Sequence, residues 1–265
     1  MSSRPLILLT NDDGIYSPGL AASARALHGL GDILIAAPQQ QQSGAGRSLA
    51  GAGTVSKVEL DLGFDLAGAF AVEGTPALAV RTAIMALADK QVSLVVSGIN
   101  YGENIGIGIT VSGTLGAAIE GAAFGVPALA VSLETDVIHH YTISDEVSFS
   151  CAADITLRAA THILEQGLPR GVEIIKIDVP NDAHPDTPWR LTNLSRLFYY
   201  ESTLVADRNG QLQVQGYTRT ERFDELEPES DAYALLVERA VSVSPLTIDL
   251  SARAALDGSF SWQPL

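Results

Sequence analysis

Two adjacent carboxylates lie near the amino terminus, in the sequence Asn11-Asp12-Asp13-Gly14. Two neighbouring carboxylates repel one another when they are crowded together, which raises the pKa of one of them unless a cation is present. A divalent metal ion removes this repulsion, and carboxylate oxygens are ligands that suit Mg²⁺ or Mn²⁺. The alternative is an Asx turn at a strand-to-helix corner, with both aspartates in solvent. The pair therefore predicts either a metal site or a solvated turn.

Two further segments combine hydroxyl or amide side chains with glycine. Ser43 and Gly44 open a Ser-Gly-Ala-Gly stretch whose backbone N–H groups can hold an anion, although a flexible surface connection is the simpler interpretation of this stretch alone. The second segment contains Asn100 and Asn104, whose amide oxygens can serve as neutral metal ligands. It ends in the Ser-Gly-Thr step at 112–114, where a predicted helix begins, a position that favours phosphate. The alternative for this segment is a small-residue loop needed for close helix packing.

Basic residues are almost absent from these segments. No lysine or arginine lies between Lys90 and Arg158, and Arg47 is the only basic residue in the three segments. Phosphate bound there would have to be neutralised by backbone amides and a metal. The chain has no Gly-x-Gly-x-x-Gly after its first predicted strand, no P-loop and no Gly-x-Ser-x-Gly, which argues against the standard dinucleotide, P-loop and hydrolase-elbow sites.

Composition limits the possible partners. The 265 residues include 31 acidic and 16 basic ones, a net charge of −15, and so acidic a chain is a poor ligand for nucleic-acid polymers. A single cysteine, Cys151, excludes an intramolecular disulfide and a zinc site built on two or more cysteines. No apolar run is long enough for a membrane span or a signal-peptide core, so we expect no membrane partner and a cytoplasmic location. His139 and His140 are predicted to be solvated loop residues.

The elements that must position these residues alternate between strands and helices. Near-continuous apolar runs predict buried strands, and Ser-Pro or Thr-Pro steps predict helix starts. The predicted strands are 5–10, 32–38, 92–97, 127–133 and 172–179, and the predicted helices are 17–28, 75–88, 114–124 and 145–165. This alternation predicts an α/β fold with a largely parallel sheet. The paired aspartates follow the first strand, and ligands bind at the carboxyl ends of strands in such sheets.

The pattern changes after Pro180. Segments 191–200 and 211–217 flank the turn sequence Asp207-Arg-Asn-Gly210, which predicts an antiparallel hairpin. The acidic stretch 221–231 is predicted to be a solvated loop.

Segment 241–250 alternates apolar and polar residues but contains Pro245, which predicts an edge strand or an arm. We expect residues 1–185 to form the catalytic core and residues 186–265 to form a dependent hairpin and arm. Because an exposed strand needs a partner edge, this extension is expected to take part in oligomerisation.

The motifs, taken in order, resemble the SurE survival-protein family. They are Leu8-Leu-Thr-Asn-Asp-Asp-Gly14, Ser43-Gly44, Gly74-Thr75-Pro76, Val96-Ser-Gly-Ile-Asn100-x-Gly-x-Asn104, Ser112-Gly-Thr-x-x-Ala-Ala-x-Glu-Gly121, Pro127-Ala-Leu-Ala-Val-Ser132 and Val241-Ser-Val-Ser-Pro-Leu246. The likeness covers most of residues 5–135 closely and the tail loosely. It implies a metal-dependent 5'/3'-nucleotidase with a Rossmann-like three-layer α/β/α core and a C-terminal arm used in oligomers.

The resemblance also implies roles for individual residues. One divalent ion, Mg²⁺, Mn²⁺ or similar, would be held by Asp12, Asp13, Ser43 and Asn100. The phosphate and substrate pocket would comprise Asn11, Gly44, Asn104, Ser112, Gly113 and Thr114. The chain departs from the family at four positions that leave the metal ligands intact but bear on substrate preference: Gln41, Gln42, Leu78 and Asp178.

The predicted function is hydrolysis of nucleoside 5'- or 3'-monophosphates to nucleoside and phosphate by a metal-activated water. Asp12, Asp13 and Asn100 are the predicted catalytic residues, and either aspartate can take the proton of the water. A covalent aspartyl intermediate is disfavoured because the two aspartates are adjacent. A metal-dependent sugar-nucleotide transferase and a non-catalytic nucleotide-binding module stay open as alternatives. The expected partners are a nucleoside monophosphate and further copies of the chain, in a homodimer or homotetramer.

Overall fold

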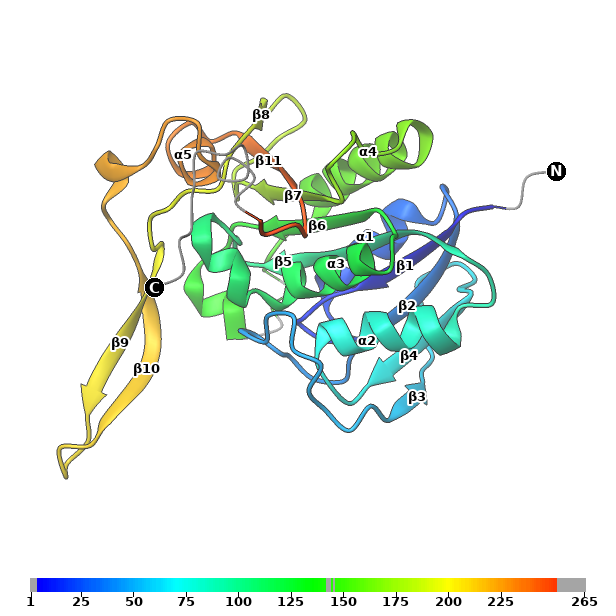
Figure 1. Ribbon diagram of the computed structural model, residues 1–265, viewed down its shortest axis with the longest axis horizontal. Helices are drawn as coiled ribbons and strands as arrows, with labels where there is room; N and C mark the ends of the chain where they lie inside the picture. The colour runs from blue at the N-terminus through cyan, green and yellow to red at the C-terminus, as the bar shows by residue number, and fades with distance from the viewer. Residues whose placement is uncertain (1–3, 142–143, 145, 252–265) are drawn as a thin grey trace, which may run out of the picture.

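The apolar runs of the sequence become the strands of one central sheet. The computed structural model describes residues 4–141, 144 and 146–251. Nine strands form the sheet in the order β3-β4-β2-β1-β5-β6-β7-β11-β8 (Figure 1). Their bounds are β1 Leu6–Thr10, β2 Asp32–Pro38, β3 Val55–Lys57, β4 Gly68–Val72, β5 Val92–Tyr101, β6 Ala128–Leu133, β7 Ile174–Val179, β8 Trp189–Leu191 and β11 Val241–Leu246. The six strands from β4 to β7 are parallel, whereas β3 and β11 run antiparallel to their neighbours β4 and β7.

Helices cover both faces of this sheet. The α-helices are α1 Pro18–Leu27, α2 Pro76–Thr82, α3 Gly113–Ala123, α4 Ser150–Gln166 and α5 Asp231–Leu236. A π-helical turn, η1 Ala83–Leu87, continues α2, and three 3₁₀ segments complete the set: η2 Gly106–Val111, η3 Val137–Tyr141 and η4 Phe223–Glu225. Within the described chain, no helix is long and apolar enough to cross a membrane. The predicted helix start at 145 lies outside the described residues.

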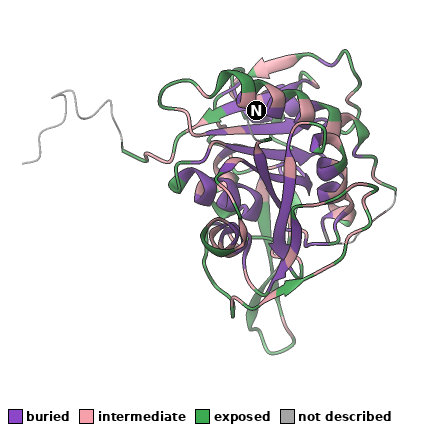
Figure 2. Cartoon of the chain, turned by 90° about the vertical axis from the view of Figure 1, so that its right-hand side faces the viewer, coloured by how far each residue is buried: buried purple, intermediate pink, exposed green. Residues whose placement is uncertain are grey.

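Alternation along β1 shows how the layers are built. Ile7 and Leu9 point to one face, into a core that contains residues of α1 and α4. Leu6 and Leu8 point to the other face, into a core that contains residues of α2 and α3. Because both faces are covered, the central strands are buried along their length, as Figure 2 shows. The predicted three-layer α/β/α fold with a largely parallel sheet is confirmed.

The order of the strands creates a crevice beside β1. From β1 the chain proceeds through β2 to β4 on one side, and from β5 through β6 to β7 on the other. The connections after β1 and β5 therefore leave the sheet in opposite directions. In open α/β sheets this switch point is where ligands bind. Asp12 follows β1, and Asn100 lies near the carboxyl end of β5.

The C-terminal part of the chain departs from two expectations. The strand predicted for an edge or an arm is β11, which lies between β7 and β8 and is paired on both sides. Pro245 is tolerated because β8 pairs only with Val241–Val243, so β11 is open on that side at the proline. Asp231, placed in a solvated acidic stretch, is instead fully buried at the start of α5.

A separate two-stranded sheet, β9 Tyr200–Ala206 and β10 Leu212–Arg219, forms the predicted hairpin. Its first strand begins where the predicted one ended, and the turn over residues 207–210 lies where it was expected. The hairpin projects away from the body of the molecule (Figure 1). The role of residues 186–265 in oligomers stays a prediction, and residues 252–265 of the predicted arm lie outside the described residues.

Candidate active site

The turn after β1 fixes the position of the paired aspartates. Asn11 is buried, its Nδ2 donates to the Gly14 carbonyl (3.0 Å), and the Gly14 N–H donates back to Asn11 Oδ1 (3.2 Å). Asn11 thus closes an Asx-type turn and does not line the cavity described below. Both polar groups of its side chain form hydrogen bonds within the turn, and its assignment to the substrate pocket stays a prediction.

Asp12 is held against the start of α3. It is only 6% exposed, and Thr114 Oγ1 donates to its Oδ1 (2.6 Å). Backbone N–H groups of Gly113 and Thr114 also favour the charged carboxylate, yet burial still raises the pKa of Asp12. A Cβ on Gly113 would lie 2.7 Å from Asp12 Cβ, so only glycine allows this approach. Gly113 and Thr114, predicted to bind phosphate, therefore contact the side chain of Asp12 at the start of α3.

Asp13 has weaker hydrogen bonds and a more unfavourable environment. The Tyr101 N–H donates to its Oδ2 (3.3 Å), and Gln41 Nε2 lies 3.5 Å from its Oδ1. Burial, followed by the charge of Asp12, raises the pKa of Asp13 well above its usual range. No cationic side chain of the described chain forms an ion pair with either aspartate. Asp12 is therefore buried and Asp13 half-buried without a positive partner within the described chain.

A β-bulge brings Asn100 to the same place. The pairing of β5 with β6 shifts register between Ser97 and Asn100, and Gly98 at that point has φ +127°. A Cβ on Gly98 would lie 2.2 Å from the Val131 carbonyl oxygen, so the bulge requires glycine. Asn100 Nδ2 donates to the carbonyls of Tyr101 (3.1 Å) and Gly102 (2.7 Å). This use of Nδ2 leaves the amide oxygen Oδ1 as the atom of Asn100 that can bind a metal.

The Ser43 loop is tied to both sides of the site. The Gln42 N–H donates to the Asp12 carbonyl (2.7 Å), and the Gly46 N–H donates to the Val111 carbonyl (3.0 Å). Arg47 turns away, because its Nε donates to Glu120 Oε2 (2.8 Å) inside α3. The only basic residue of the three predicted segments is thus paired with a buried glutamate.

These segments enclose a cavity of about 360 Å³. Six residues of the predicted site line it: Asp12, Ser43, Gly44, Asn100, Asn104 and Ser112. Four do not: Asn11, Asp13, Gly113 and Thr114. Of these, Gly113 and Thr114 contact Asp12. No lysine or arginine is among the lining residues of the described chain. The cavity therefore combines acidic, hydroxyl and amide groups with no cation.

The other wall of the cavity comes from residues that the sequence did not single out. It includes His140 and three tyrosines of the hairpin and the residue before it: Tyr199, Tyr200 and Tyr217. These residues are far from the aspartates in sequence and share no spacing with them. In the sequence, Tyr199 and Tyr200 stand side by side in a predicted strand, but such a pair is equally typical of a packed sheet and does not indicate a site.

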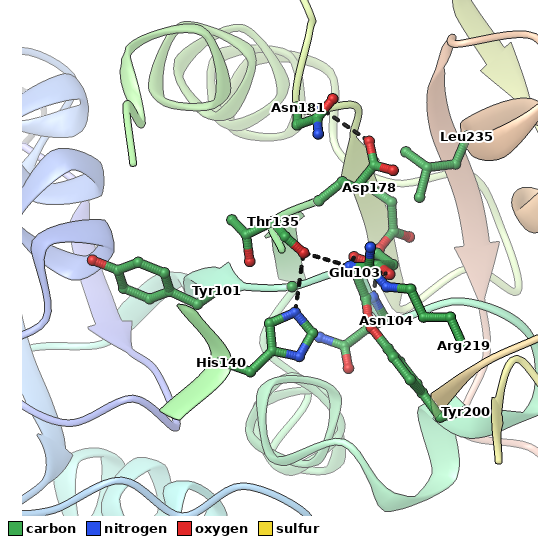
Figure 3. Close-up of polar contacts among 12 residues, drawn as sticks. Tyr101, Glu103, Asn104, Thr135, His140, Asp178, Asn181, Tyr200, Arg219 and Leu235 are labelled. Carbon is green, nitrogen blue, oxygen red and sulfur yellow. Dashed lines mark hydrogen bonds and ion pairs between the residues drawn. The ribbon is translucent and has the colours of Figure 1, made fainter. Parts of the chain in front are cut away.

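His140 is buried and neutral. The Thr135 carbonyl can only accept a hydrogen bond, so His140 Nε2, 3.3 Å away, carries the proton. Nδ1 then accepts a hydrogen bond from the Tyr217 hydroxyl (2.7 Å), and this bond joins η3 to the hairpin. Figure 3 shows the contact of His140 with Thr135. Burial, followed by the charge of Arg219, lowers the pKa of His140 to about 4. The prediction that His140 is a solvated loop residue is wrong because the hairpin covers it.

An ion pair anchors the base of the hairpin beside the cavity. Arg219 Nη2 lies 2.9 Å from Glu103 Oε1 and also donates to the Thr135 carbonyl (Figure 3). Burial raises the pKa of Glu103, and the nearby Arg219 opposes that shift. The Tyr200 hydroxyl donates to the Glu103 carbonyl (3.3 Å). The hairpin is thus fixed to the loop that lines the cavity.

A second cluster of buried charges supports the same loop. Lys176 Nζ pairs with Asp178 Oδ2 and with Asp231 Oδ2 (2.9 Å), and all three side chains are fully buried. Asp178 Oδ1 accepts from the Asn104 N–H (2.7 Å), and Asp231 Oδ2 accepts from the Gly106 N–H (2.9 Å). Burial raises the pKa of Asp178 to about 6 despite the ammonium of Lys176. The cluster therefore positions Asn104 without entering the cavity.

The residues fit a divalent cation. The carboxylates of buried Asp12 and half-buried Asp13 repel one another, and Asn100 and Ser43 add neutral oxygens nearby. Hard divalent cations take this oxygen-only donor set, whereas a transition-metal site built on histidine or cysteine would need other residues. Within the described chain, no group of three or more histidine, cysteine, aspartate or glutamate side chains is arranged around one point.

Known proteins are similar to this chain in sequence and in fold. The family described as Survival protein SurE matches residues 7–201. The 5'-nucleotidase SurE of Thermococcus gammatolerans is 43% identical over 251 residues, which cover 93% of this chain and 91% of that protein. The 5'-nucleotidase SurE of Methanothermobacter thermautotrophicus is 46% identical over 197 residues, which cover 73% of this chain and 74% of that protein.

Solved structures agree with the sequence comparison. The crystal structure of the SurE protein from Aquifex aeolicus superposes with a TM-score of 0.78 at 29% sequence identity, covering 96% of this chain and 98% of that chain. The match therefore includes the C-terminal strands as well as the core. The resemblance inferred from the motifs is confirmed, and the chain belongs to the SurE survival-protein family.

Proposed function

We propose that this protein is a divalent-metal-dependent phosphomonoesterase that hydrolyses nucleoside 5'- or 3'-monophosphates to nucleoside and phosphate. The observation that carries the proposal is the pair of buried Asp12 and half-buried Asp13, which has no cationic partner within the described chain and lies at the switch point of the sheet. Buried charge without a partner is unfavourable for folding, so it marks a functional site. The names of the relatives, 5'-nucleotidase SurE, support the substrate class.

Asp12, Asp13, Ser43 and Asn100 are the residues that would hold one divalent ion, Mg²⁺ or Mn²⁺. Bound there, the ion would polarise a phosphoryl oxygen and lower the pKa of a coordinated water. Asp12 is the aspartate that lines the cavity, which suits it to accept the proton of the attacking water at the oxygen not held by Thr114. Asp13, next to it in the turn after β1, is suited to a ligand role.

Neutral groups orient the phosphate. The Ser43 hydroxyl, the Gly44 N–H and the Asn104 side chain reach the cavity from separate loops. Asn104 is fixed because its Nδ2 donates to Ser132 Oγ (2.9 Å) and its N–H donates to Asp178. Since no lysine or arginine lines the cavity in the described chain, the charge of the phosphate must be balanced by the metal and by hydrogen bonds.

Further parts of the proposal concern assembly. The hairpin exposes Leu204, Leu212 and Val214 on strands that have no neighbour other than each other within the described chain. Exposed strand edges of this kind favour pairing with a second copy. We therefore retain the homodimer or homotetramer expected from the sequence as part of the proposal. The cytoplasmic location stays a prediction.

Phosphate release from AMP, without any acceptor, tests the function. The assay compares Mn²⁺, Mg²⁺ and excess EDTA, for the wild type, for Asp13→Asn and for Asp65→Asn, an exposed aspartate outside the cavity. We expect turnover that needs the metal, is lost in Asp13→Asn and persists in Asp65→Asn. Turnover only after addition of a sugar acceptor would support the transferase alternative. Binding of AMP without turnover would support the nucleotide-binding module.

A further inference from the structure

Two large apolar side chains that line the cavity are exposed, beside the hydroxyl residues Thr110 and Ser202. Phe198 is 66% exposed and Val111 is 60% exposed, and both line the cavity that contains Asp12. Val111 ends η2, whereas Phe198 precedes β9, so the two come from separate parts of the chain. Single exposed apolar residues are common on protein surfaces. Two of them on one cavity, together with Ile107, indicate a surface that contacts a ligand.

The tyrosines beside Phe198 form a rigid support and offer few polar groups. The Tyr200 ring packs edge-on against Tyr199 (centroids 4.7 Å apart) and Tyr217 (4.8 Å). The hydroxyls of Tyr200 and Tyr217 are bonded to the Glu103 carbonyl and to His140. Phe198 differs from them because it is the most exposed aromatic side chain among the described lining residues. Its ring is therefore available to a ligand.

Two sets of lining residues define the chemistry of the cavity's occupant. Asp12, Ser43, Asn100 and Asn104 supply the metal-ligating and phosphate-binding groups, and Phe198, Ile107 and Val111 supply an aromatic ring and aliphatic side chains. A phosphate ester that also contains a planar heteroaromatic ring matches both sets. A second phosphate group does not match the apolar set, because no lysine or arginine is among the described lining residues.

We propose that Phe198, with Ile107 and Val111, is the stacking surface for the nucleobase of the substrate, and that it determines the preference for nucleotides over other phosphate esters. The inference rests on the proposed phosphomonoesterase function. Base–aromatic stacking contributes enough affinity to alter substrate choice, and it tolerates different bases because each has a π-face. Recognition of the nucleobase is therefore expected through the face of its ring.

Two substrates distinguish binding of the base from binding of the phosphate: AMP, and ribose 5-phosphate, which lacks the base. In Phe198→Ala we expect the ratio of kcat/KM for AMP to kcat/KM for ribose 5-phosphate to fall about tenfold or more, mainly through the KM for AMP. Phe198→Trp should restore the ratio. Phe223→Ala is the matched control, because Phe223 is 46% exposed on the same C-terminal extension but does not line the cavity. It should keep the wild-type ratio.

A binding measurement gives a result even when turnover fails. The fluorescence of 2-aminopurine riboside 5'-monophosphate falls when its base stacks, so we expect quenching with the wild type and a roughly tenfold weaker Kd with Phe198→Ala. Quenching without turnover of either substrate would refute the proposed function and retain the stacking surface. An unchanged ratio and Kd, or equal losses for both substrates, would overturn the inference. So would a changed sedimentation coefficient of Phe198→Ala, which would assign Phe198 to an interface between copies.

Discussion

Two pairs of aspartates lie near the carboxyl ends of the parallel strands, and they differ in their cationic partners. Asp178 and Asp231 are fully buried, share the ammonium of Lys176 and accept hydrogen bonds from four backbone N–H groups. Asp12 and Asp13 have hydrogen bonds but no cation within the described chain. The first pair is complete within the fold and serves to position a loop. The second is incomplete, so a cation from solution has to complete it.

Asp12→Asn gives the largest expected effect. Removing one carboxylate deletes a metal ligand and a proton acceptor, so AMP hydrolysis in Mn²⁺ should fall about 10³-fold or more. The same change removes like-charge repulsion, and the apo protein should unfold at the same or a higher temperature in EDTA. Phosphate-release assays and thermal denaturation measure the two effects. Near-native activity at saturating metal would remove Asp12 from the mechanism.

Lys176→Met removes the cation shared by Asp178 and Asp231. Two buried carboxylates would lose their cation, and the free energy of unfolding should fall by about 3–5 kcal/mol. Urea denaturation of the wild type and the variant measures this loss, and Lys90→Met serves as a control because Lys90 forms a more exposed ion pair. If Lys176→Met is as stable as the wild type, the cluster does not hold the fold together.

Metal should control phosphate affinity more than any side chain does. Phosphate beside Asp12 and Asp13 meets like charge, which a divalent ion reverses, so affinity should rise about 10- to 100-fold from EDTA to Mn²⁺. Arg47→Ala should change it less than about threefold, because Arg47 is paired with Glu120. Calorimetric titration of phosphate tests both. Tight binding in EDTA that disappears in Arg47→Ala would indicate an arginine-based anion site instead.

His140 in the wall of the cavity and Asp178 in the buried charge cluster should affect the pH dependence of stability in opposite directions. His140 has a pKa of about 4 in the fold against about 6.5 when unfolded, so its contribution is present above pH 6.5 and is lost as the pH falls toward 4. Asp178, with a pKa raised to about 6, acts in the opposite direction, because its protonation between pH 6 and 3.8 favours the fold.

Comparison with His140→Gln isolates the histidine. Glutamine can retain the bonds to Thr135 and Tyr217 but does not titrate. The stability of the wild type relative to this variant should therefore drop by on the order of 2 kcal/mol from pH 7 to pH 4.5. Urea denaturation across this range measures the difference. A constant difference would mean that His140 is not buried in solution.

The smallest effect on stability is expected on the hairpin. Leu212→Ser changes an exposed residue, so the free energy of unfolding of one chain should change by no more than about 0.5 kcal/mol. Self-association should weaken if the hairpin contacts a second copy. Sedimentation velocity at micromolar concentration checks this. A wild-type chain that sediments as a 27.9 kDa monomer would contradict the oligomer.

Local patterns predicted the half of the site that lies on strand ends. Apolar runs predicted β1 and the first part of β5, and the polar residues that follow these runs marked Asp12, Asp13 and Asn100 as candidates. β5 extends to Tyr101, so Asn100 lies within the strand. The other half depends on contacts between distant segments. Arg219 is 116 residues from Glu103, and His140 is 77 residues from Tyr217, so no spacing connects them. For the same reason the sequence predicts a solvated loop at Asp231, because no spacing connects Asp231 on α5 with its partner Lys176 on β7.

Calorimetric titration of Mn²⁺ tests the central claim most directly, namely that the Asp12–Asp13 pair is completed by a divalent cation. The wild type and Asp178→Asn, in which the complete pair is altered, should each bind one Mn²⁺ per chain at this site. Asp13→Asn should lose that binding while its far-UV circular dichroism stays that of the wild type. Equal Mn²⁺ affinity in Asp13→Asn and the wild type would contradict the account.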